Sequence, residues 1–417
     1  MDSDYFFNKA TKQRKPSVLR EIANKIFKMS KGSINLAGGF PDVQTFPFQE
    51  FSFKLRTGEH VRLADKELAV ALQYLPTLGY GNLLTKLKEI QNRFHGPQDW
   101  NAKTILITCG AQQGLAYAFE MILERGDPVI IAEPAFELVL NSLKPFEPEY
   151  ISIAQDSMGV IIEDIENILS TRRKHGWSMP KVIYINPTGS NPTGIVMPND
   201  RRRELYRLAC EYNIIILEDD PYFFLNFQKE NPISFLSMDT ESRVIRVDSF
   251  SKIMSPGMRL GYVTGSTEFV LKMEMFVQNS ILHVSSLSQM VAYKLLTTWN
   301  DQGFDAHVAR IKEFYRQKRD CMMRAVAKHL GELAECCEPA GGMFLWLKID
   351  GLQDTKRLVT ENCLEKHVIF APGFSFGSDH QKPSQYVRVS YSVASPEDID
   401  RGISLLAVAI REELLMR

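Results

Sequence analysis

The fold of this chain is indicated by residues 181–222, which read KVIYINPTGSNPTGIVMPNDRRRELYRLACEYNIIILEDDPY. Two short apolar runs, Lys181–Ile185 and Asn213–Leu217, enclose a segment with a helical pattern. Runs of this length, apolar throughout, are typical of strands that are buried on both faces of a sheet. A helix between two such strands predicts a parallel pair joined by a right-handed crossover.

The same alternation extends on both sides of this stretch. Further strands are predicted at Thr104–Thr108, Pro128–Ala132, Arg243–Val247 and Leu260–Thr264. A helix is predicted from Ala111 to Leu123. The sequence therefore predicts an α/β fold whose large domain has a mostly parallel sheet flanked by helices.

The last third of the chain has a different pattern. It predicts a long charged helix over residues 301–330, strands at 342–348 and 386–390, and a final helix from Pro396 to Leu415 with Ser395 as its N-cap. This pattern indicates a smaller α+β domain. We expect an N-terminal segment (1–45) that packs with the active site and the small domain, a large domain (46–300) and a small C-terminal domain (301–417).

Composition excludes several classes of protein. The 417 residues are 44% hydrophobic and 24% charged, with a formal net charge of -1, which is ordinary for a globular protein and unlike a nucleic-acid binder. Six cysteines without a CxxC pair predict no metal site, and no apolar run is long enough for a membrane helix. Basic residues near the N-terminus favour a mitochondrial transit signal, but Asp2, Asp4 and Glu21 oppose one. We expect a cytoplasmic protein, with the mitochondrion as the alternative.

Polar residues follow each predicted strand, and ligands of open parallel sheets bind at the carboxyl ends of the strands. The first strand leads into Cys109–Gly114, a turn before a helix whose start can bind an anion. The second leads to Phe136, which can stack on a flat ring. The third leads to Asn186–Gly194, in which Asn-Pro-Thr-Gly occurs twice. Taken singly, an ordinary turn or a core aromatic explains each of these.

The last two strand ends carry charge. Glu218–Tyr222 places carboxylates after a buried strand, where an unpaired charge is costly, so these carboxylates need a cation or a hydrogen-bond donor. A metal ion is the alternative partner, but the sequence has no histidine ligand nearby. Asp248–Lys252 sets a lysine among hydroxyls, with Arg259 just beyond, a combination suited to a phosphate and a reactive amine. A lone loop lysine is usually only solvated. Together the five strand ends indicate a flat, phosphorylated aldehyde with a basic ring nitrogen.

These residues resemble those of fold-type I aminotransferases of class I, and most closely the kynurenine/α-aminoadipate aminotransferase group. The resemblance extends from Leu36–Gly39 through Gln73–Tyr74, Ser249–Lys252 and Pro339–Trp346 to Arg388, nearly the whole chain. It implies a pyridoxal 5'-phosphate (PLP) enzyme that moves an amino group from kynurenine, 2-aminoadipate or a similar large amino acid to a 2-oxo acid such as 2-oxoglutarate.

The resemblance also implies a role for each cofactor residue. Lys252 would hold PLP as a Schiff base and then carry the proton, and Asp219 would pair with the ring nitrogen. Asn191 and Tyr222 would bind the ring hydroxyl, and Phe136 would stack on the ring. The phosphate would contact Ala111, Gln112, Ser249, Ser251, Arg259 and, from the partner subunit of a homodimer, Tyr74.

For the substrate, the resemblance assigns the α-carboxylate to Arg388, because a guanidinium meets a carboxylate bidentately. Arg20, Gly39 and Phe344 would line the side-chain pocket together with Asn191 and Tyr74. The chain departs from its relatives at two positions: Ala111 often stands as Ser, and Phe136 as Tyr. Each change removes a hydroxyl and leaves the backbone N–H or the stacking ring in place.

Alternative functions stay open. A PLP-dependent β-lyase acting on cysteine conjugates, or a decarboxylase, would use the same cofactor residues. An aromatic or branched-chain aminotransferase would differ only in the side-chain pocket. A transcription regulator with an aminotransferase-like domain would carry a winged-helix domain ahead of this fold, and about 35 residues before Leu36 are too few for one.

Overall fold

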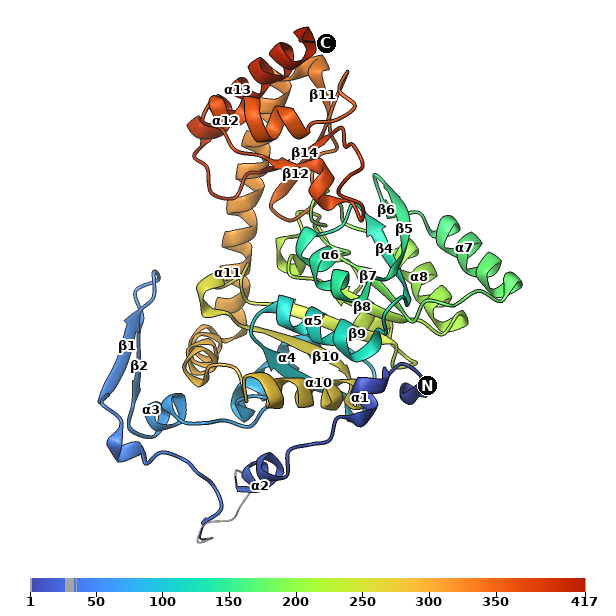
Figure 1. The fold of residues 1–417 in the computed structure, drawn as a ribbon. Helices are drawn as coiled ribbons and strands as arrows, with labels where there is room; N and C mark the ends of the chain where they lie inside the picture. The colour runs from blue at the N-terminus through green and yellow to red at the C-terminus, as the bar shows by residue number, and fades with distance from the viewer. Residues whose placement is uncertain (1, 27–33, 35, 417) are drawn as a thin grey trace. The chain divides into compact units, whose positions relative to one another are not determined.

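A computed structural model describes residues 2–26, 34 and 36–416 (Figure 1). The chain divides into two compact units, one of residues 1–124 and 236–306, the other of residues 125–235 and 307–417. The chain passes from one unit to the other after Glu124, within α9 (Phe235–Met238) and within α11 (Ser286–His329). Each unit has its own sheet strands and helices.

The first unit contains three neighbouring strands, in the order β3 (Lys103–Thr108), β10 (Gly261–Ser266) and β9 (Val244–Ser249). The central strand β10 runs antiparallel to both neighbours. The helices that pack on these strands are α4 (Gly81–Phe94), α5 (Ala111–Ile122) and α10 (Thr267–Ser280).

The same unit carries the N-terminal elements. Helices α1 (Lys9–Gln13) and α2 (Val18–Ile26) come first, and α1 contacts α5. A two-stranded hairpin of β1 (Glu50–Lys54) and β2 (His60–Ala64) then leads into α3 (Asp65–Leu72) (Figure 1).

The second unit contains the parallel strands. Their order is β8 (Ile215–Asp219), β7 (Val182–Ile185), β4 (Pro128–Glu133) and β5 (Glu149–Asp156), with the short β6 (Gly159–Val160) antiparallel at the edge. All residues of β7 and β8 are buried, as the continuous apolar runs predict. The accompanying helices are α6 (Glu137–Leu143), α7 (Ile162–His175) and α8 (Asn199–Glu211).

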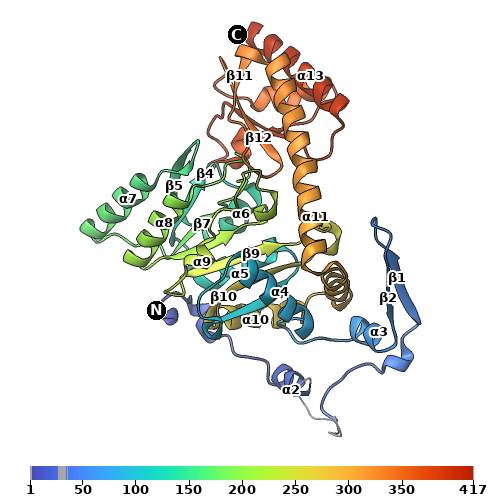
Figure 2. The ribbon, with the colours of Figure 1, turned by 180° about the vertical axis from the view of Figure 1, so that it is seen from behind.

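A small antiparallel sheet follows in the same unit, in the order β11 (Ala334–Glu335), β12 (Phe344–Ile349), β14 (Tyr386–Ser390) and β13 (Ala371–Pro372). The short α12 (Cys363–Glu365) and the final α13 (Pro396–Leu415) accompany it. One face of β12 and β14 is buried in a core that also takes in residues of α11 and α13 (Figures 1 and 2). Arg388 pairs with Trp346 on the opposite face.

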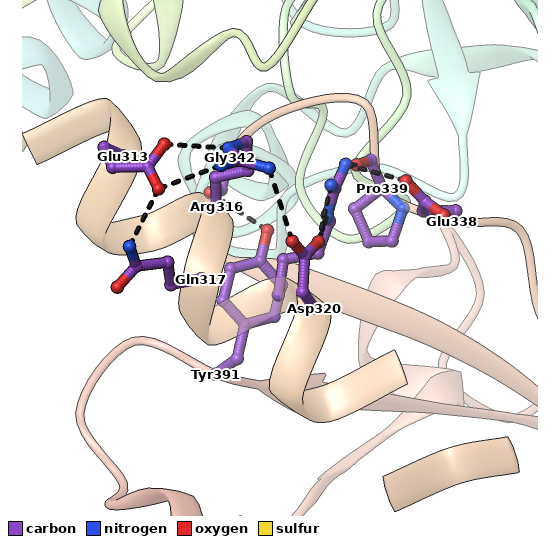
Figure 3. Close-up of polar contacts among 9 residues, drawn as sticks. Glu313, Arg316, Gln317, Asp320, Glu338, Pro339, Gly342 and Tyr391 are labelled. Atoms are coloured by element: carbon purple, nitrogen blue, oxygen red, sulfur yellow. Dashed lines mark hydrogen bonds and ion pairs between the residues drawn. The ribbon is translucent and has the colours of Figure 1, made fainter. Parts of the chain in front are cut away.

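Helix α11 is interrupted at Asn300, whose φ of 50° is not helical. Farther along, the helix carries a row of ion pairs, with Arg316 bound to Glu313 at 2.9 Å and reaching Asp320 at 3.5 Å (Figure 3). Tyr391 in the same close-up donates from its hydroxyl to the carbonyl of Gly342 at 3.0 Å. This bond joins the end of β14 to the loop that precedes β12.

That loop is held tightly against two others. The N–H groups of Ala340 and Gly341 donate to the carbonyl of Gly194, and the N–H of Gly342 donates to Leu225. A Cβ on Gly194 would lie 2.7 Å from Pro339, and a Cβ on Gly189 would collide with the backbone of Gly342. Glycine is therefore required where these loops cross.

The fold class predicted from the sequence is confirmed, and every predicted strand is present. β14, α13 and the Ser395 N-cap, which accepts from Asp398 N–H at 3.0 Å, agree with the prediction. Four details differ from the prediction or were not predicted. β8 begins two residues after the predicted start, because Asn213 has a φ of 56° and ends the preceding turn. β10 is antiparallel, and neither β5 nor the β1–β2 hairpin was predicted.

Candidate active site

In the first unit, the start of α5 forms an anion cradle. Gly110 precedes the helix with a φ of 77° and has no side chain to cap the first turn, where the positive end of the helix dipole favours an anion. A Cβ at Gly110 would lie 2.7 Å from Nη2 of Arg259, so the guanidinium lies against this turn. Arg259 also donates to the carbonyl of Cys109 at 3.4 Å. The sequence-predicted phosphate residues Ala111 and Arg259 therefore lie together.

Lys252 lies half-buried in the turn that follows β9. The turn is closed by the N–H of Met254, which donates to the carbonyl of Phe250 at 2.8 Å. Ser249 Oγ accepts from the N–H of Ser251 at 3.1 Å, so the two serines before the lysine form one compact loop. The loop thus has a defined shape around the predicted reactive amine.

A buried polar network holds the end of β9, directly before this loop. Asp248, the residue before Ser249, accepts from Arg246 Nη2 at 2.9 Å and from Gln91 Nε2 at 2.9 Å. The same Gln91 amide reaches the hydroxyl of Tyr262 at 3.0 Å. Arg246 is fully buried and therefore needs this carboxylate as its counter-charge.

In the second unit, Asp219 ends β8 and is only 4% exposed. Its Oδ2 accepts from the hydroxyl of Tyr184 on the neighbouring strand β7 at 2.8 Å. Burial, followed by the charge of Asp219, raises the pKa of Tyr184 well above its ordinary value, so the phenol stays a donor. Asn186 holds the backbone at the same place, because its Nδ2 donates to the carbonyl of Asp219 at 2.7 Å.

Asn191 and Arg388 are brought together by the loop after β7 and by strand β14. Nη1 of Arg388 donates to Oδ1 of Asn191 at 2.9 Å, and the N–H of Asn191 donates to Asn186. The guanidinium lies 4.2 Å from the centre of the Phe344 ring and 4.9 Å from that of Phe376. Its burial lowers the pKa of Arg388, although the group stays cationic.

Tyr222 belongs to the same group of side chains. Its ring meets Phe344 edge-on, with the centroids 6.2 Å apart. Burial, followed by the charge of Asp219, raises the pKa of Tyr222, while Arg388 opposes the rise. The hydroxyl is therefore protonated at neutral pH. Phe136 is half-buried as the N-cap of α6, next to Ala135, whose N–H donates to the carbonyl of Phe376 at 2.8 Å.

The predicted side-chain pocket residues Arg20 and Tyr74 lie together in the first unit. Arg20 is 7% exposed and donates to the carbonyl of Leu75 and, at 3.0 Å, to the hydroxyl of Thr77. The Tyr74 ring meets Phe40 edge-on at a centroid distance of 6.2 Å. Gly39 is exposed, and a side chain there would meet open space.

Residues 53–406 match the model of the family described as aminotransferase class I and II. This chain is a member of that family. The aminotransferase is 38% identical to the mitochondrial kynurenine/alpha-aminoadipate aminotransferase of Mus musculus, over 99% of this chain and all of that one. The Bos taurus protein of the same name is 37% identical over 98% of this chain and 99% of its own.

A solved structure agrees with these relatives. The kynurenine aminotransferase of Pyrococcus horikoshii, solved in complex with PMP, KYN and KYA, is 32% identical and superimposes with a TM-score of 0.79. The match covers 99% of this chain and 98% of that one. The prediction of a PLP-dependent aminotransferase related to the kynurenine/α-aminoadipate group is thereby confirmed. Its substrates are amino acids and 2-oxo acids.

No three His, Cys, Asp or Glu side chains among the described residues lie close enough together to hold a metal ion. Within residues 2–26, 34 and 36–416, no helix has both the length and the apolar character that crossing a membrane requires.

Sequence reasoning missed several side chains that shape the site of the aminotransferase. Tyr184 was counted only as part of an apolar strand, yet it is the one residue of Val182–Ile185 with a polar group. Asn186 was expected to present its side chain to the cleft from a turn, but its bond to the carbonyl of Asp219 was not predicted. Gln91 and Phe376 gave no signal, because each meets its partners through contacts distant in sequence.

Proposed function

We propose that this aminotransferase binds pyridoxal 5'-phosphate and transfers the amino group of kynurenine, 2-aminoadipate or a similar large amino acid to a 2-oxo acid such as 2-oxoglutarate. The observation that carries the proposal is the pair of Arg388 and Asn191 beside Phe344, a cation prepared to receive a carboxylate next to an apolar wall. The names of the mouse and bovine relatives support the choice of donors.

The residues present fit the cofactor. Its phosphate matches the cradle at Gly110, where the helix start and Arg259 supply positive potential. Its basic ring nitrogen matches Asp219, a buried carboxylate that Tyr184 holds in place. On the substrate side, Nε of Arg388 is buried and has no hydrogen-bond partner among the described residues, so one donor of the fork is still available for a carboxylate.

When bound, pyridoxal phosphate supplies an aldehyde that exchanges amino groups and a cationic ring that withdraws electrons. We assign the proton transfer to Lys252: its amine would take the proton from Cα of the amino acid and deliver it to the carbon that carried the aldehyde of the cofactor, which is general acid–base catalysis. Asp219 keeps the ring nitrogen protonated. Asn191 and Tyr222 bind the ring hydroxyl, and Phe136 stacks on the ring; Ala111, Gln112, Ser249, Ser251 and Arg259 hold the phosphate.

For the amino acid, we assign the α-carboxylate to Arg388, whose planar fork matches two oxygens. Asn191 and Phe344, which contact the guanidinium of Arg388, would orient the same end of the substrate, and we assign Phe344 to the wall of the side-chain pocket as well. We assign the side chain of the substrate to Arg20, Gly39 and Tyr74, which belong to α2, to the segment before the β1–β2 hairpin and to the segment after α3. Selectivity among large donors then depends on these segments.

We further propose a homodimer in which Tyr74 of each subunit completes the phosphate site of the other. Tyr74 is 42% exposed, as expected of a side chain that meets a partner. Light scattering coupled to size-exclusion chromatography would give twice the 47.6 kDa chain mass. A cytosolic location is proposed, with the mitochondrion as the alternative, which the names of the mouse and bovine relatives favour.

The deciding experiment incubates purified protein with kynurenine and 2-oxoglutarate and measures kynurenic acid and glutamate. Formation of both supports the proposal. Pyruvate and ammonia without glutamate, from a cysteine conjugate, would instead indicate a β-lyase. A panel of donors that includes aminoadipate, methionine, and aromatic and branched-chain amino acids then ranks kcat/KM. A higher kcat/KM for aromatic or branched-chain donors than for kynurenine and aminoadipate would indicate an aromatic or branched-chain aminotransferase instead.

Lys252→Ala tests the catalytic assignment. We expect turnover to be lost while the protein still holds pyridoxal phosphate without a covalent bond, because the anion cradle and Asp219 are unchanged. The readouts are the initial rate and the loss of the absorbance band of the lysine-bound cofactor. A variant that turns over at the wild-type rate would falsify the assignment.

A further inference from the structure

His283 has both ring nitrogens fixed by backbone groups of the first unit. Nδ1 lies 2.8 Å from the carbonyl oxygen of Val284, and the N–H of Leu75 lies 3.3 Å from Nε2. A carbonyl oxygen can only accept, so Nδ1 carries the hydrogen. A backbone N–H can only donate, so Nε2 presents its lone pair. The two contacts together define one neutral tautomer of His283.

The Leu75 residue that His283 holds is also the residue that holds Arg20. Its N–H donates to His283, and its carbonyl accepts from Nη2 of Arg20. The second anchor of Arg20 is the hydroxyl of Thr77, 3.0 Å from Nε. One short stretch of backbone therefore connects the imidazole to the guanidinium.

Tyr74 is fixed by the same ring. Its side chain meets His283 edge-on, with the centroids 5.8 Å apart and the planes at 85°. Tyr74 and Leu75 both line a cavity of about 740 Å³. Leu282, directly before the histidine, has a φ of 67°, an unusual conformation for a branched side chain that persists only where its surroundings impose it.

We infer that His283 is a positioning residue for donor selection: its neutral ring fixes the Leu75 backbone and thereby places Arg20 and Tyr74 for the side chain of the amino acid. The inference rests on the proposed function, because it takes Arg20 and Tyr74 as the residues that meet the donor. His283 itself does not contact the substrate in this scheme.

The charges around the ring agree with a neutral histidine. The titratable groups near it are Arg20, Tyr74 and, beside Arg20, Glu274. Burial lowers the pKa of His283, and Arg20 adds to the decrease, while the Val284 carbonyl opposes it. A proton on Nε2 would face the Leu75 N–H with a second donor and remove the bond.

Three substitutions separate this role from plain packing. His283→Gln can place an amide oxygen near the position of Nε2 and keep the acceptor for Leu75. His283→Asn can keep the hydrogen bond to the carbonyl of Val284 but loses the acceptor for the N–H of Leu75. His283→Phe keeps the flat ring beside Tyr74 and neither hydrogen bond. If His283 only fills space, the Phe variant should keep the wild-type kinetics best. If it only donates to the carbonyl of Val284, the Asn variant should keep them best.

The experiment measures kcat and KM for kynurenine, aminoadipate and alanine with each holoenzyme. We expect KM for the two large donors to rise about tenfold in the Asn and Phe variants, the value of one neutral hydrogen bond, with kcat within about twofold. The Gln variant should stay near wild type. KM for alanine should change little in all three variants, because its side chain does not extend to Arg20.

Hydrogen exchange supplies a readout that does not depend on activity. Peptides that contain Leu75 should exchange faster in the Asn and Phe variants than in wild type, and the Gln variant should remain protected. If wild type does not transaminate kynurenine, the proposed function fails, while the exchange data still report on the backbone anchor. Wild-type selectivity and wild-type protection of Leu75 in the Asn and Phe variants would overturn the inference.

Discussion

Tyr184→Phe removes a single oxygen from the centre of the second unit. The hydroxyl of Tyr184 donates to Oδ2 of Asp219 at 2.8 Å, and Tyr184 is 1% exposed. The phenyl ring of the variant occupies the same volume, so the substitution leaves the packing of β7 intact. What changes is the number of donors that hold the buried carboxylate.

The magnitude follows from the charge of the acceptor. A hydrogen bond to an ionised group contributes about 1.5–3 kcal/mol, roughly twice the value for a neutral pair. If Asp219 pairs with the ring nitrogen of the cofactor, part of this energy appears as cofactor affinity. Because each 1.4 kcal/mol is tenfold in a binding constant, we expect Kd for pyridoxal phosphate to rise by roughly 10- to 100-fold.

The assay titrates apoprotein with pyridoxal phosphate and follows the absorbance of the bound form. Tyr150→Phe is the matched control, because the one partner that the hydroxyl of Tyr150 has among the described residues is a neutral carbonyl, that of Leu140, at 3.5 Å. The control should bind as wild type does. If Tyr184→Phe also binds with wild-type affinity and differs only in thermal stability, the hydroxyl serves the fold alone and the reasoning about Asp219 is refuted.

Three further predictions concern other parts of the molecule. Arg388→Lys should raise KM for every amino donor about tenfold or more, because an ammonium cannot make the bidentate contact; initial-rate kinetics that show an unchanged KM would remove Arg388 from the carboxylate site. Asp248→Asn should cost about 3–5 kcal/mol in the free energy of unfolding, because it removes a negative charge that the buried guanidinium of Arg246 contacts at 2.9 Å; denaturant melts that show a loss under 1 kcal/mol would contradict this. Acid should weaken the wild type more than His283→Gln: the native pKa of His283 lies below its ordinary value of 6.5, so between the two values only the unfolded chain binds the proton and stability falls as the pH decreases from about 6.5. Thermal melts at several pH values check this, and identical slopes for the two proteins would count against it.

The parts of the fold that the sequence predicted are those with a local signal. The predicted runs that form β7 and β8 are apolar along their whole length. The last helix is preceded by Ser395, a residue type that is strongly preferred at the N-cap. The direction of β10 has no such signal, because a buried run looks the same in a parallel and in an antiparallel sheet. β5 was missed since its pattern alternates between buried and exposed positions and includes polar residues.

The residues of the candidate site also divide into those with a local sequence signal and those without one. Residues placed directly after strands, such as Lys252, Asp219 and Asn191, could be named because the carboxyl ends of strands gather ligands. Tyr184 meets its partner 35 positions away, and His283 meets Leu75 208 positions away. No local pattern encodes such pairs, and only the folded chain brings them together.

The crossing of the loops at Gly189, Gly194 and Gly342 limits how this enzyme can evolve. Even alanine is excluded at these positions, because its methyl group would enter a neighbouring backbone or Pro339. The crossed loops that carry Asn191 and lead into β12 therefore do not tolerate single substitutions at these three glycines. New donor preferences must then arise from segments with space for larger side chains, such as Gly39, where a methyl group would touch nothing.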